Sequence, residues 1–538
     1  MRIKTASLKN FFESRTALLL VITGAAVLRI TNLTKESLWL DEIYSISFVA
    51  ARNALHVVRD TFSIDFHPFS YYLLLDIWTG VFGISDYSAR LLSALLGTGA
   101  VFTAWLLVKT LFKDKRAAVL CAFLAAVSPY HITFSQEVRM YVLLLLVWPL
   151  FLCAQYKCVH TRYSLKYSLL LLAAFAVFAY AHSCSGLFAL PLLVLCAGIF
   201  AVRSPGAKHR RGAVRAAAVA LCGTVLYLPW LNRLISLKAS AKQLGTFGVN
   251  EALHFFPILL SRHDVFSSGL LVAGIIAAPC MLLLLFRRRR LWTGVAAPVL
   301  PLLASIAAVI MIQFLLSFFR PLYKIQNLIF LLPPVLACAS VIIVRLMGLS
   351  QFSDAARFSS RFTYPLVFVL CSVFILSTVI CTIHQMKCGY RKEQWREAVF
   401  CIEPKIQRGD ILAFYAGFTH ICWEHYARGR GIIEKNDSGA PEYLIVKIPR
   451  TGSSAEAERS VNILISTMRR KINPCRALWM FYSHVNNAGH MDALLNKAGL
   501  RETHTWTGIG IGAKCYLLEQ PYNNDTLLHE PPRNTPLF

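Results

Sequence analysis

Long apolar stretches separated by short polar loops dominate the first 386 residues of the chain. A helix needs about 20 mainly apolar residues to cross the roughly 30 Å hydrocarbon core of a bilayer, and eleven stretches approach or reach this length. They cover residues 15–32, 88–109, 116–134, 139–157, 166–182, 185–203, 213–231, 266–286, 291–318, 322–345 and 364–386. The pattern predicts a polytopic α-helical membrane domain over residues 1–386 with about 11 transmembrane helices.

From residue 387 the pattern becomes that of a soluble α/β domain. The β-rich runs ILAFYAG, YLIVKIP, ALWMFYS and GIGAKCYLLEQ alternate with helical spacing in KEQWREAVFCIEPKI and in residues 455–470 and 487–498. We expect a small α/β domain with a mixed or mainly parallel sheet over residues 387–522. The tail, residues 523–538, contains EPPRNTP and is predicted to be disordered.

The longest loop between predicted spans, residues 33–87, has a helical pattern of its own. Within residues 41–60 the side chains of Ile43, Ile46 and Val49 share one face with further apolar residues. This spacing predicts a single amphipathic helix that lies in the membrane interface rather than crossing it.

The distribution of charge indicates which loops face the cytoplasm. The formal net charge is +27, and alternate loops carry 23 Lys and Arg residues against three acidic ones, whereas the opposite loops are nearly balanced. This is the positive-inside pattern, and it predicts a cytoplasmic N-terminus. With an odd number of spans, the loop 33–87 and the domain after residue 387 are then exported. Membrane lipids, and not nucleic acid, are the partner that this charge predicts.

Two adjacent carboxylates, Asp41 and Glu42, follow the first predicted span in the stretch SLWLDEIYSISF. A charged group beside a membrane span costs several kcal/mol unless it is paired or hydrated, so it is a candidate functional group. The same two residues would also suit the first turn of a helix, where they stabilise by only about 1 kcal/mol. The residues alone leave both interpretations open.

Further polar side chains stand at the external ends of predicted spans. Positive charge is otherwise depleted on this side, so cations here indicate an anionic partner, and a phosphate at headgroup level would serve. An aromatic and basic belt at the membrane interface is the alternative. The candidates are His67, His131, Glu137, Arg139, Tyr141, Arg320, Tyr323 and Lys324. His182, at the end of the fifth predicted span, is interpreted as a boundary histidine.

Four motifs follow one another in the first quarter of the chain: Leu-Trp-Leu-Asp-Glu, His-Pro-x-x-Tyr-Tyr-Leu-Leu, Ser-Ala-Arg-Leu-x-Ser-Ala-Leu-x-Gly and Ser-Pro-x-His-x-x-x-Ser-Gln-Glu-x-Arg-Met-Tyr. In this order they resemble the integral-membrane glycosyltransferases of the C-type fold. The resemblance is to the bacterial branch related to protein O-mannosyltransferases and lipid A aminoarabinose transferases, and it covers residues 15 to about 345.

The resemblance implies a hexosyl- or pentosyltransferase in a bacterial inner membrane, with its C-terminal domain in the periplasm or outside. Such an enzyme moves a sugar from a polyprenyl-phosphate donor to an extracytoplasmic acceptor. Its catalytic carboxylate corresponds to Asp41, with Glu42 beside it. The aminoarabinose branch has a Lys-Pro-Pro stretch where this chain has His67, Pro68 and Phe69, so donor sugar and acceptor identity stay open.

Elementary chemistry fits this activity. A carboxylate such as Asp41 can take the proton of an attacking sugar hydroxyl, and fixed cations such as Arg139, Arg320 or Lys324 stabilise the departing lipid phosphate. One displacement inverts the anomeric carbon. No nucleotide-binding signature is present, and a divalent cation is compatible with the reaction although no clear ligand set is visible. Further candidate substrate contacts are Tyr71, His131, Glu137, Tyr141 and Tyr323.

Two other classes of protein remain as alternatives. A secondary transporter or lipid flippase would show inverted repeats and ionisable groups near mid-membrane, whereas the ionisable candidates here gather at the external ends of spans. A non-catalytic scaffold carrying an exported binding domain would leave the paired carboxylates and the cationic span ends without a role.

Overall fold

The structure is a computed structural model that forms two compact units. It describes residues 14–50, 53–203, 210–236, 302–316, 324–349, 392–407, 409–428, 444–448, 454–471, 477–484 and 488–518, with a few single residues between 258 and 387. The first unit comprises Met1–Thr34 and Ser45–Cys388, and the second comprises Lys35–Tyr44 and Gly389–Phe538. The division passes through helix α3 (Leu40–Val49).

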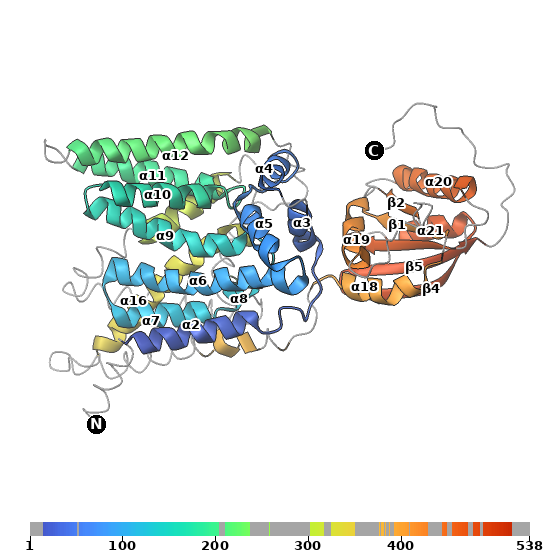
Figure 1. The fold of residues 1–538 in the computed structure, drawn as a ribbon, viewed down its shortest axis with the longest axis horizontal. Coiled ribbons are helices and arrows are strands. Elements are labelled where there is room, and N and C mark those ends of the chain that lie inside the picture. The colour runs from blue at the N-terminus through green and yellow to red at the C-terminus, as the bar shows by residue number, and fades with distance from the viewer. Residues whose placement is uncertain are drawn as a thin grey trace, which may run out of the picture. The chain divides into compact units, whose positions relative to one another are not determined.

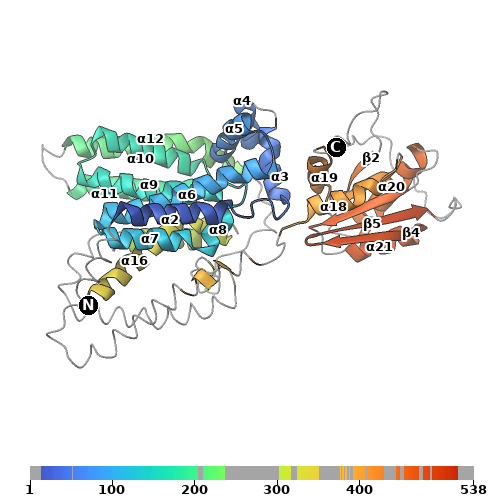
Figure 2. The same cartoon turned by 60° about the horizontal axis from the view of Figure 1, so that its bottom comes forward.

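The described part of the first unit is helical (Figure 1). Its elements are α2 (Arg15–Ile30), α4 (Ala54–Ser63), α5 (Ser70–Phe82), α6 (Asp86–Phe112), α7 (Lys115–Ala126), α8 (Pro129–Ser135), α9 (Tyr141–His160), α10 (Leu165–Ala179), α11 (Ser185–Arg203), α12 (Arg210–Ser236), η1 (Ile325–Leu331) and α16 (Leu332–Leu349). The helices α6, α9, α10, α11 and α12 lie side by side in a bundle, and the short helices α4 and α5 lie at one end of it in both views (Figures 1 and 2).

Several of these helices have the length and composition of membrane spans. Within the described residues, five are long and apolar enough to cross a bilayer, or six when α7 and α8 count as one bent span. The five are α6, α9, Ser185–Val202 of α11, α12 and Ile325–Arg345. The polytopic helical architecture is confirmed, but the predicted total of eleven spans is not. The predicted span 266–286 and most of 364–386 lie outside the described residues.

The third predicted span, residues 116–134, is not a straight helix. It consists of α7 and α8, which meet at an angle of 62°, and Pro129 begins α8. A break leaves the last carbonyls of α7 without helical partners, which is costly away from water. The guanidinium of Arg29, on α2, supplies donors: Nη2 lies 3.0 Å from the carbonyl oxygen of Ala125 and Nη1 3.2 Å from that of Ala126.

The predicted interfacial helix over residues 41–60 is two helices instead of one. Helix α3 ends at Val49 and α4 begins at Ala54. The side-chain oxygen of Asn53 accepts hydrogen bonds from the backbone amides of Leu55 and His56. Asn53 therefore acts as the N-cap of a new helix, a role that Asn fills well because its side chain competes for backbone donors.

The Ser-Ala-Arg-Leu-x-Ser-Ala-Leu-x-Gly motif lies in the first half of α6 and has a packing role. Arg90 Nη1 donates to the carbonyl of Leu33 at 2.7 Å. Gly97 allows a close approach between α6 and α8, because a Cβ atom there would lie 2.1 Å from the Oγ atom of Ser135. These contacts hold the segment after α2 and the bent pair α7–α8 against α6.

The second unit contains a five-stranded mixed sheet, in agreement with the predicted α/β domain. Its strands are β1 (Ile411–Tyr415), β2 (Leu444–Ile448), β3 (Leu478–Ser483), β4 (Leu500–Gly508) and β5 (Ile511–Leu518), and its helices include α18 (Trp395–Ile402), α19 (His420–Arg428), α20 (Ser454–Lys471) and α21 (Ala488–Lys497). The strand order is β2-β1-β3-β5-β4. β1 pairs in parallel with β2 and β3, whereas β5 is antiparallel to β3 and β4.

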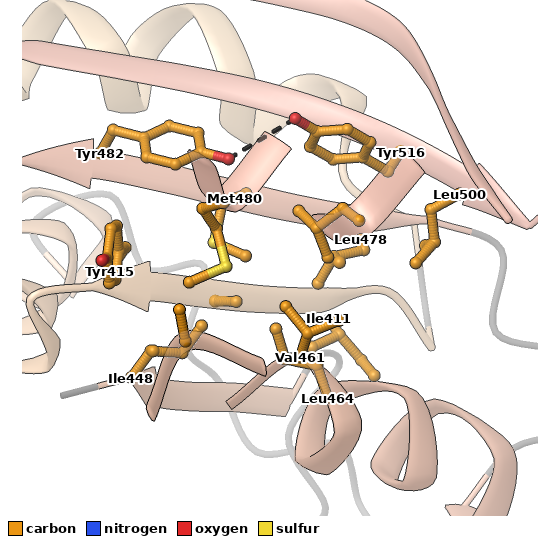
Figure 3. Close-up of a cluster of buried hydrophobic side chains, with 14 residues drawn as sticks. Ile411, Tyr415, Ile448, Val461, Leu464, Leu478, Met480, Tyr482, Leu500 and Tyr516 are labelled. Carbon is orange, nitrogen blue, oxygen red and sulfur yellow. Dashed lines mark hydrogen bonds between the residues drawn. The ribbon is translucent and has the colours of Figure 1, made fainter. Parts of the chain in front are cut away.

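Both faces of the sheet are covered by helices. On one face, side chains of β1 and β3 such as Ile411 and Met480 pack with Val461 and Leu464 of α20, and Tyr482 and Tyr516 approach each other through their hydroxyls (Figure 3). On the other face, Phe414 stacks on Phe481 with ring centroids 4.7 Å apart, and Trp423 of α19 lies against both rings. The alternation of side chains along β1 and β3 thus fills two apolar layers.

Candidate active site

The connection between α4 and α5 carries Asp65 and His67 in a fixed conformation. The carboxylate of Asp65 accepts a hydrogen bond from the amide of Phe66 at 2.7 Å and from the hydroxyl of Tyr72 at 2.6 Å. Burial raises the pKa of Asp65, while Tyr72 and the positive charge of Arg139 act in the opposite direction. Asp65 thereby fixes the backbone that presents His67.

The ring of His67 lies against the ring of His182, with centroids 4.5 Å apart. His182 comes from the turn between α10 and α11, and its Nδ1 atom accepts a hydrogen bond from the amide of Cys184 at 3.3 Å. The ring of His182 also lies near that of Tyr141 at the start of α9, with ring centroids 5.7 Å apart. Three segments that are distant in the sequence therefore meet at His182.

Two cations act on this histidine pair. Burial lowers the pKa of His67 well below its usual value, and the charges of His182, Arg139 and Lys324 lower it further. His67 is consequently neutral at pH 7, and the charges of a guanidinium and an ammonium group act on it. We call His67, His182, Arg139 and Lys324 the His67 cluster. Its combination of positive charge and neutral hydrogen-bonding rings suits an anionic ligand with several oxygen atoms.

The Ser-Gln-Glu-x-Arg-Met-Tyr motif supplies Arg139 and explains how it is held. Gln136 Nε2 donates to carbonyls at the end of α2, including that of Thr31 at 3.0 Å, and the amide of Arg139 donates to the carbonyl of Glu137 at 2.8 Å. Arg139 is buried, and its Nη1 atom lies 3.4 Å from the hydroxyl of Ser45. The segment between α8 and α9 is thus attached to the end of α2 and has little freedom to move.

Other predicted site residues have different environments. His131 is buried and its Nδ1 atom contacts Arg29 and Ser135, at 3.0 and 3.1 Å. The hydroxyl of Tyr71 lies 2.7 Å from that of Ser93, between α5 and α6. These contacts hold both side chains between helices, and the substrate contacts expected of His131 and Tyr71 stay predictions. Glu137 is buried, whereas Arg320 and Tyr323 lie outside the described residues.

In the second unit, Asp41 and Glu42 occupy the first turn of α3 but differ in environment. Glu42 is fully buried, its Oε2 atom accepts from the amide of Trp39 at 3.4 Å, and it forms an ion pair with Lys392 at 3.2 Å. This is the carboxylate half of a capping box. Asp41 is only partly buried. Burial raises the pKa of the Cys422 thiol, and the negative charges of Glu393 and Asp41 raise it further.

The structure includes residues that the sequence patterns did not single out. Asp65 and Tyr72 support the segment that carries His67, and the ring of His182, interpreted above as a boundary histidine, lies against that of His67 at a tilt of 43°. The proximity of Asp65 to His67 in the chain was the only available signal for it. Within the part of the chain that the structure describes, no group of three or more His, Cys, Asp or Glu side chains could hold a metal ion.

Residues 66–231 match the family model described as dolichyl-phosphate-mannose-protein mannosyltransferase. This range includes His67, Arg139 and His182 of the His67 cluster. A comparison with curated proteins gives no match.

Among solved structures, the chain is similar to ArnT from Cupriavidus metallidurans bound to undecaprenyl phosphate, with a TM-score of 0.53 and 14% identity over 93% of this chain and 98% of that chain. It is also similar to the archaeal oligosaccharyltransferase AglB from Archaeoglobus fulgidus in complex with an inhibitory peptide and a dolichol-phosphate. That match has a TM-score of 0.51 and 13% identity over 95% of this chain and 75% of that chain. The expected resemblance to membrane glycosyltransferases of the C-type fold is confirmed. The chain is an integral membrane protein with that fold.

Proposed function

We propose that the protein is a glycosyltransferase that moves a sugar from a polyprenyl-phosphate donor to an acceptor on the extracytoplasmic face of a bacterial inner membrane. The His67 cluster carries this proposal: the charges of Arg139 and Lys324 act on a neutral histidine pair, and three of the four residues lie in a segment that matches a dolichyl-phosphate-mannose-protein mannosyltransferase family model. The undecaprenyl phosphate bound by ArnT supports a lipid phosphate as the ligand. The acceptor is a hydroxyl-bearing molecule.

In the proposed reaction, the acceptor hydroxyl attacks the anomeric carbon and a new bond between carbon and oxygen forms. The bond from that carbon to the phosphate oxygen breaks, and its electron pair leaves with the lipid phosphate. A single displacement of this kind inverts the anomeric centre. Asp41 takes the hydroxyl proton as general base. Glu42 is paired with Lys392 and caps α3, so it is assigned a structural role here.

The leaving group gains negative charge as its bond to the sugar breaks. Arg139 and Lys324 stabilise that charge, and they do so most effectively where water is excluded. His67 and His182 are neutral in this proposal, so they donate hydrogen bonds to phosphate oxygens without adding charge. Donor binding and leaving-group stabilisation thus fall to one cluster, and proton removal falls to Asp41.

The first test is a transfer assay with purified protein and a panel of polyprenyl-phosphate sugars. Asp41→Asn is expected to lower turnover by roughly 10²–10⁴-fold, the usual contribution of a general base, because the amide cannot take a proton. Binding of undecaprenyl phosphate should be retained. Asp60→Asn, the same change on α4 of the same external segment, is the matched control. Undiminished transfer by Asp41→Asn would remove this residue from the mechanism.

The second test concerns the donor site. Arg139→Ala is expected to weaken binding of undecaprenyl phosphate at least about tenfold, since a buried charged hydrogen bond to phosphate is lost. The measurement is the ligand-induced rise in unfolding temperature across a concentration series. Arg59→Ala, an exposed arginine of α4, should leave the rise unchanged. Equal rises for Arg139→Ala and wild type would count against a phosphate site at the His67 cluster.

A further inference from the structure

Residues Lys35–Tyr44, which follow the first predicted span, cluster with the C-terminal domain and not with their sequence neighbours. Backbone contacts hold this segment along its length. The carbonyl of Lys35 accepts from Arg396 Nη2 at 3.3 Å, and the amide of Leu38 donates to the hydroxyl of Tyr426 at 2.6 Å. These partners are more than 350 residues apart in the chain.

Side chains of the same segment add two further attachments. The hydroxyl of Ser37 donates to the carbonyl of Glu393 at 2.5 Å, and Ser37 is fully buried. The carboxylate of Glu42 is 0% exposed and lies 3.2 Å from Lys392 Nζ, itself 14% exposed. A buried carboxylate is strongly held by its cation, because separation of the pair would leave a charge away from water.

These attachments fix the first turn of α3 in rotation as well as in position. The backbone amide of Trp39 donates a hydrogen bond to the carboxylate of Glu42, and this carboxylate forms an ion pair with Lys392. Adjacent residues of an α-helix project about 100° apart around the axis. With the direction of Glu42 set, the direction in which the Cα–Cβ bond of Asp41 leaves the helix is set as well.

We propose that Lys392 is a positioning residue, and that the C-terminal domain uses it, together with Tyr426, to hold Asp41 in the orientation required for proton removal. This inference rests on the proposed role of Asp41 as general base. It gives the exported domain a part in the transfer reaction itself. A carboxylate that is misplaced by about 1 Å can lose about 10²-fold in rate even when the substrate is still bound.

The experiment compares steady-state transfer by the full-length protein carrying Lys392→Met, Lys392→Arg or Lys514→Met. Lys514 forms ion pairs with Asp492 at 2.7 Å and Glu502 at 2.9 Å in the same unit, so it controls for the loss of a lysine ion pair. Lys392→Met is expected to lower kcat about 10²-fold while the donor KM stays within about twofold. Lys392→Arg should restore most of the rate, and Lys514→Met should keep it.

Hydrogen exchange supplies a readout that does not depend on turnover. Amides within Lys35–Tyr44 are expected to exchange at least about tenfold faster in Lys392→Met, because this segment detaches from the C-terminal domain more often. Exchange in β1 and β3 should be unchanged. Tyr426→Phe removes only the hydroxyl that accepts from Leu38. It should give a smaller change in the same direction, and it keeps the proposal testable if Lys392→Met does not fold.

The outcomes separate this inference from the proposed function. Wild-type kcat in Lys392→Met, or faster exchange at Lys35–Tyr44 with no loss of kcat, overturns the positioning role while Asp41→Asn can still be inactive. Equal losses in Lys392→Met and Lys514→Met overturn it too, because general destabilisation would then explain both. Full turnover by Asp41→Asn overturns the catalytic role of Asp41 and leaves the exchange result standing.

Discussion

His67 is a histidine that the fold keeps neutral. It is removed from water and lies against His182. Burial and the charges of His182, Arg139 and Lys324 each lower its pKa below the usual value of 6.5. A ligand that brings negative charge to the cluster would partly cancel the effect of the two cations. A lysine at position 67 would stay charged and would repel Arg139 and Lys324. The neutral histidine avoids this repulsion when no ligand is bound.

The lowered pKa of His67 predicts a loss of stability in acid. Between the folded pKa and 6.5 the unfolded chain binds a proton that the folded chain does not, so the free energy of unfolding falls as the pH is lowered from 7 to 5. His67→Gln removes this contribution. We expect the variant to lose less stability than wild type over that window, measured by denaturant unfolding in detergent at pH 7, 6 and 5.

His56→Gln is the control for the pH experiment, because His56 is exposed on α4 and its replacement should leave the pH dependence of wild type intact. Identical pH dependence in His67→Gln and wild type would show that His67 is not held neutral by its surroundings.

Sequence patterns identified some residues of the candidate site but could not distinguish adjacent ones. The position of the Asp41 and Glu42 pair beside a span made both of them candidates, yet only the fold shows that Glu42 is paired with Lys392. Lys392 lies 350 residues further along the chain. No periodicity links residues so far apart, so the different environments of the two carboxylates were not predictable.

Among the elements, the bent pair α7–α8 depends on a close approach to α6. Gly97→Ala is expected to destabilise the first unit by about 1–3 kcal/mol, the usual range for overpacking, because its Cβ would lie 2.1 Å from Ser135 Oγ and 3.3 Å from Arg29 Nε. Thermal unfolding in detergent measures the change. Gly24→Ala on α2, where nothing lies within 4 Å of the added Cβ, should be neutral or slightly stabilising. Equal melting temperatures for the two variants would contradict this account.

Four of the five strands were predicted from the sequence, and the one that was missed, β4, is largely exposed. The runs that became β1, β2, β3 and β5 are rich in apolar residues, whereas β4 has the sequence LRETHTWTG and is largely exposed apart from Leu500. It lies at the edge of the sheet, where polar side chains on both faces are common. Helix breaks were also hard to predict. Asn53 and Pro129 each begin a new helix, but the apolar pattern continues across both positions and suggests one uninterrupted helix.

For the whole molecule, the balance of basic residues predicts which side of the membrane each part occupies. A membrane-impermeant maleimide should label Cys401, an exposed cysteine of the C-terminal domain, in intact cells. Lys113→Cys, between α6 and α7, should be labelled only after the cells are permeabilised. Each protein carries a single cysteine: one keeps only Cys401, and the other has only the cysteine introduced by Lys113→Cys. Labelling of Lys113→Cys in intact cells would reverse the predicted orientation.

The hydrophobic pattern predicted a helical membrane region followed by an α/β domain, since span length and strand alternation are local properties of the chain. The association of Lys35–Tyr44 with the residues after Gly389 was not predictable in the same way. It depends on single hydrogen bonds such as that from the amide of Leu38 to the hydroxyl of Tyr426, and these produce no periodic pattern in the sequence.

Arg29 also bears on how the protein is made. Its acceptor at Ala126 lies 97 residues further along the chain, so at 5–20 residues per second a ribosome needs roughly 5–20 s to supply it. Until then the guanidinium has only the carbonyl of Ala25, in its own helix, as a protein acceptor. Its remaining donors need water or the insertion machinery, because lipid tails offer no acceptor. We therefore expect helix α2 to reach its final depth only once α7 has entered the bilayer, so that these two helices assemble as a pair.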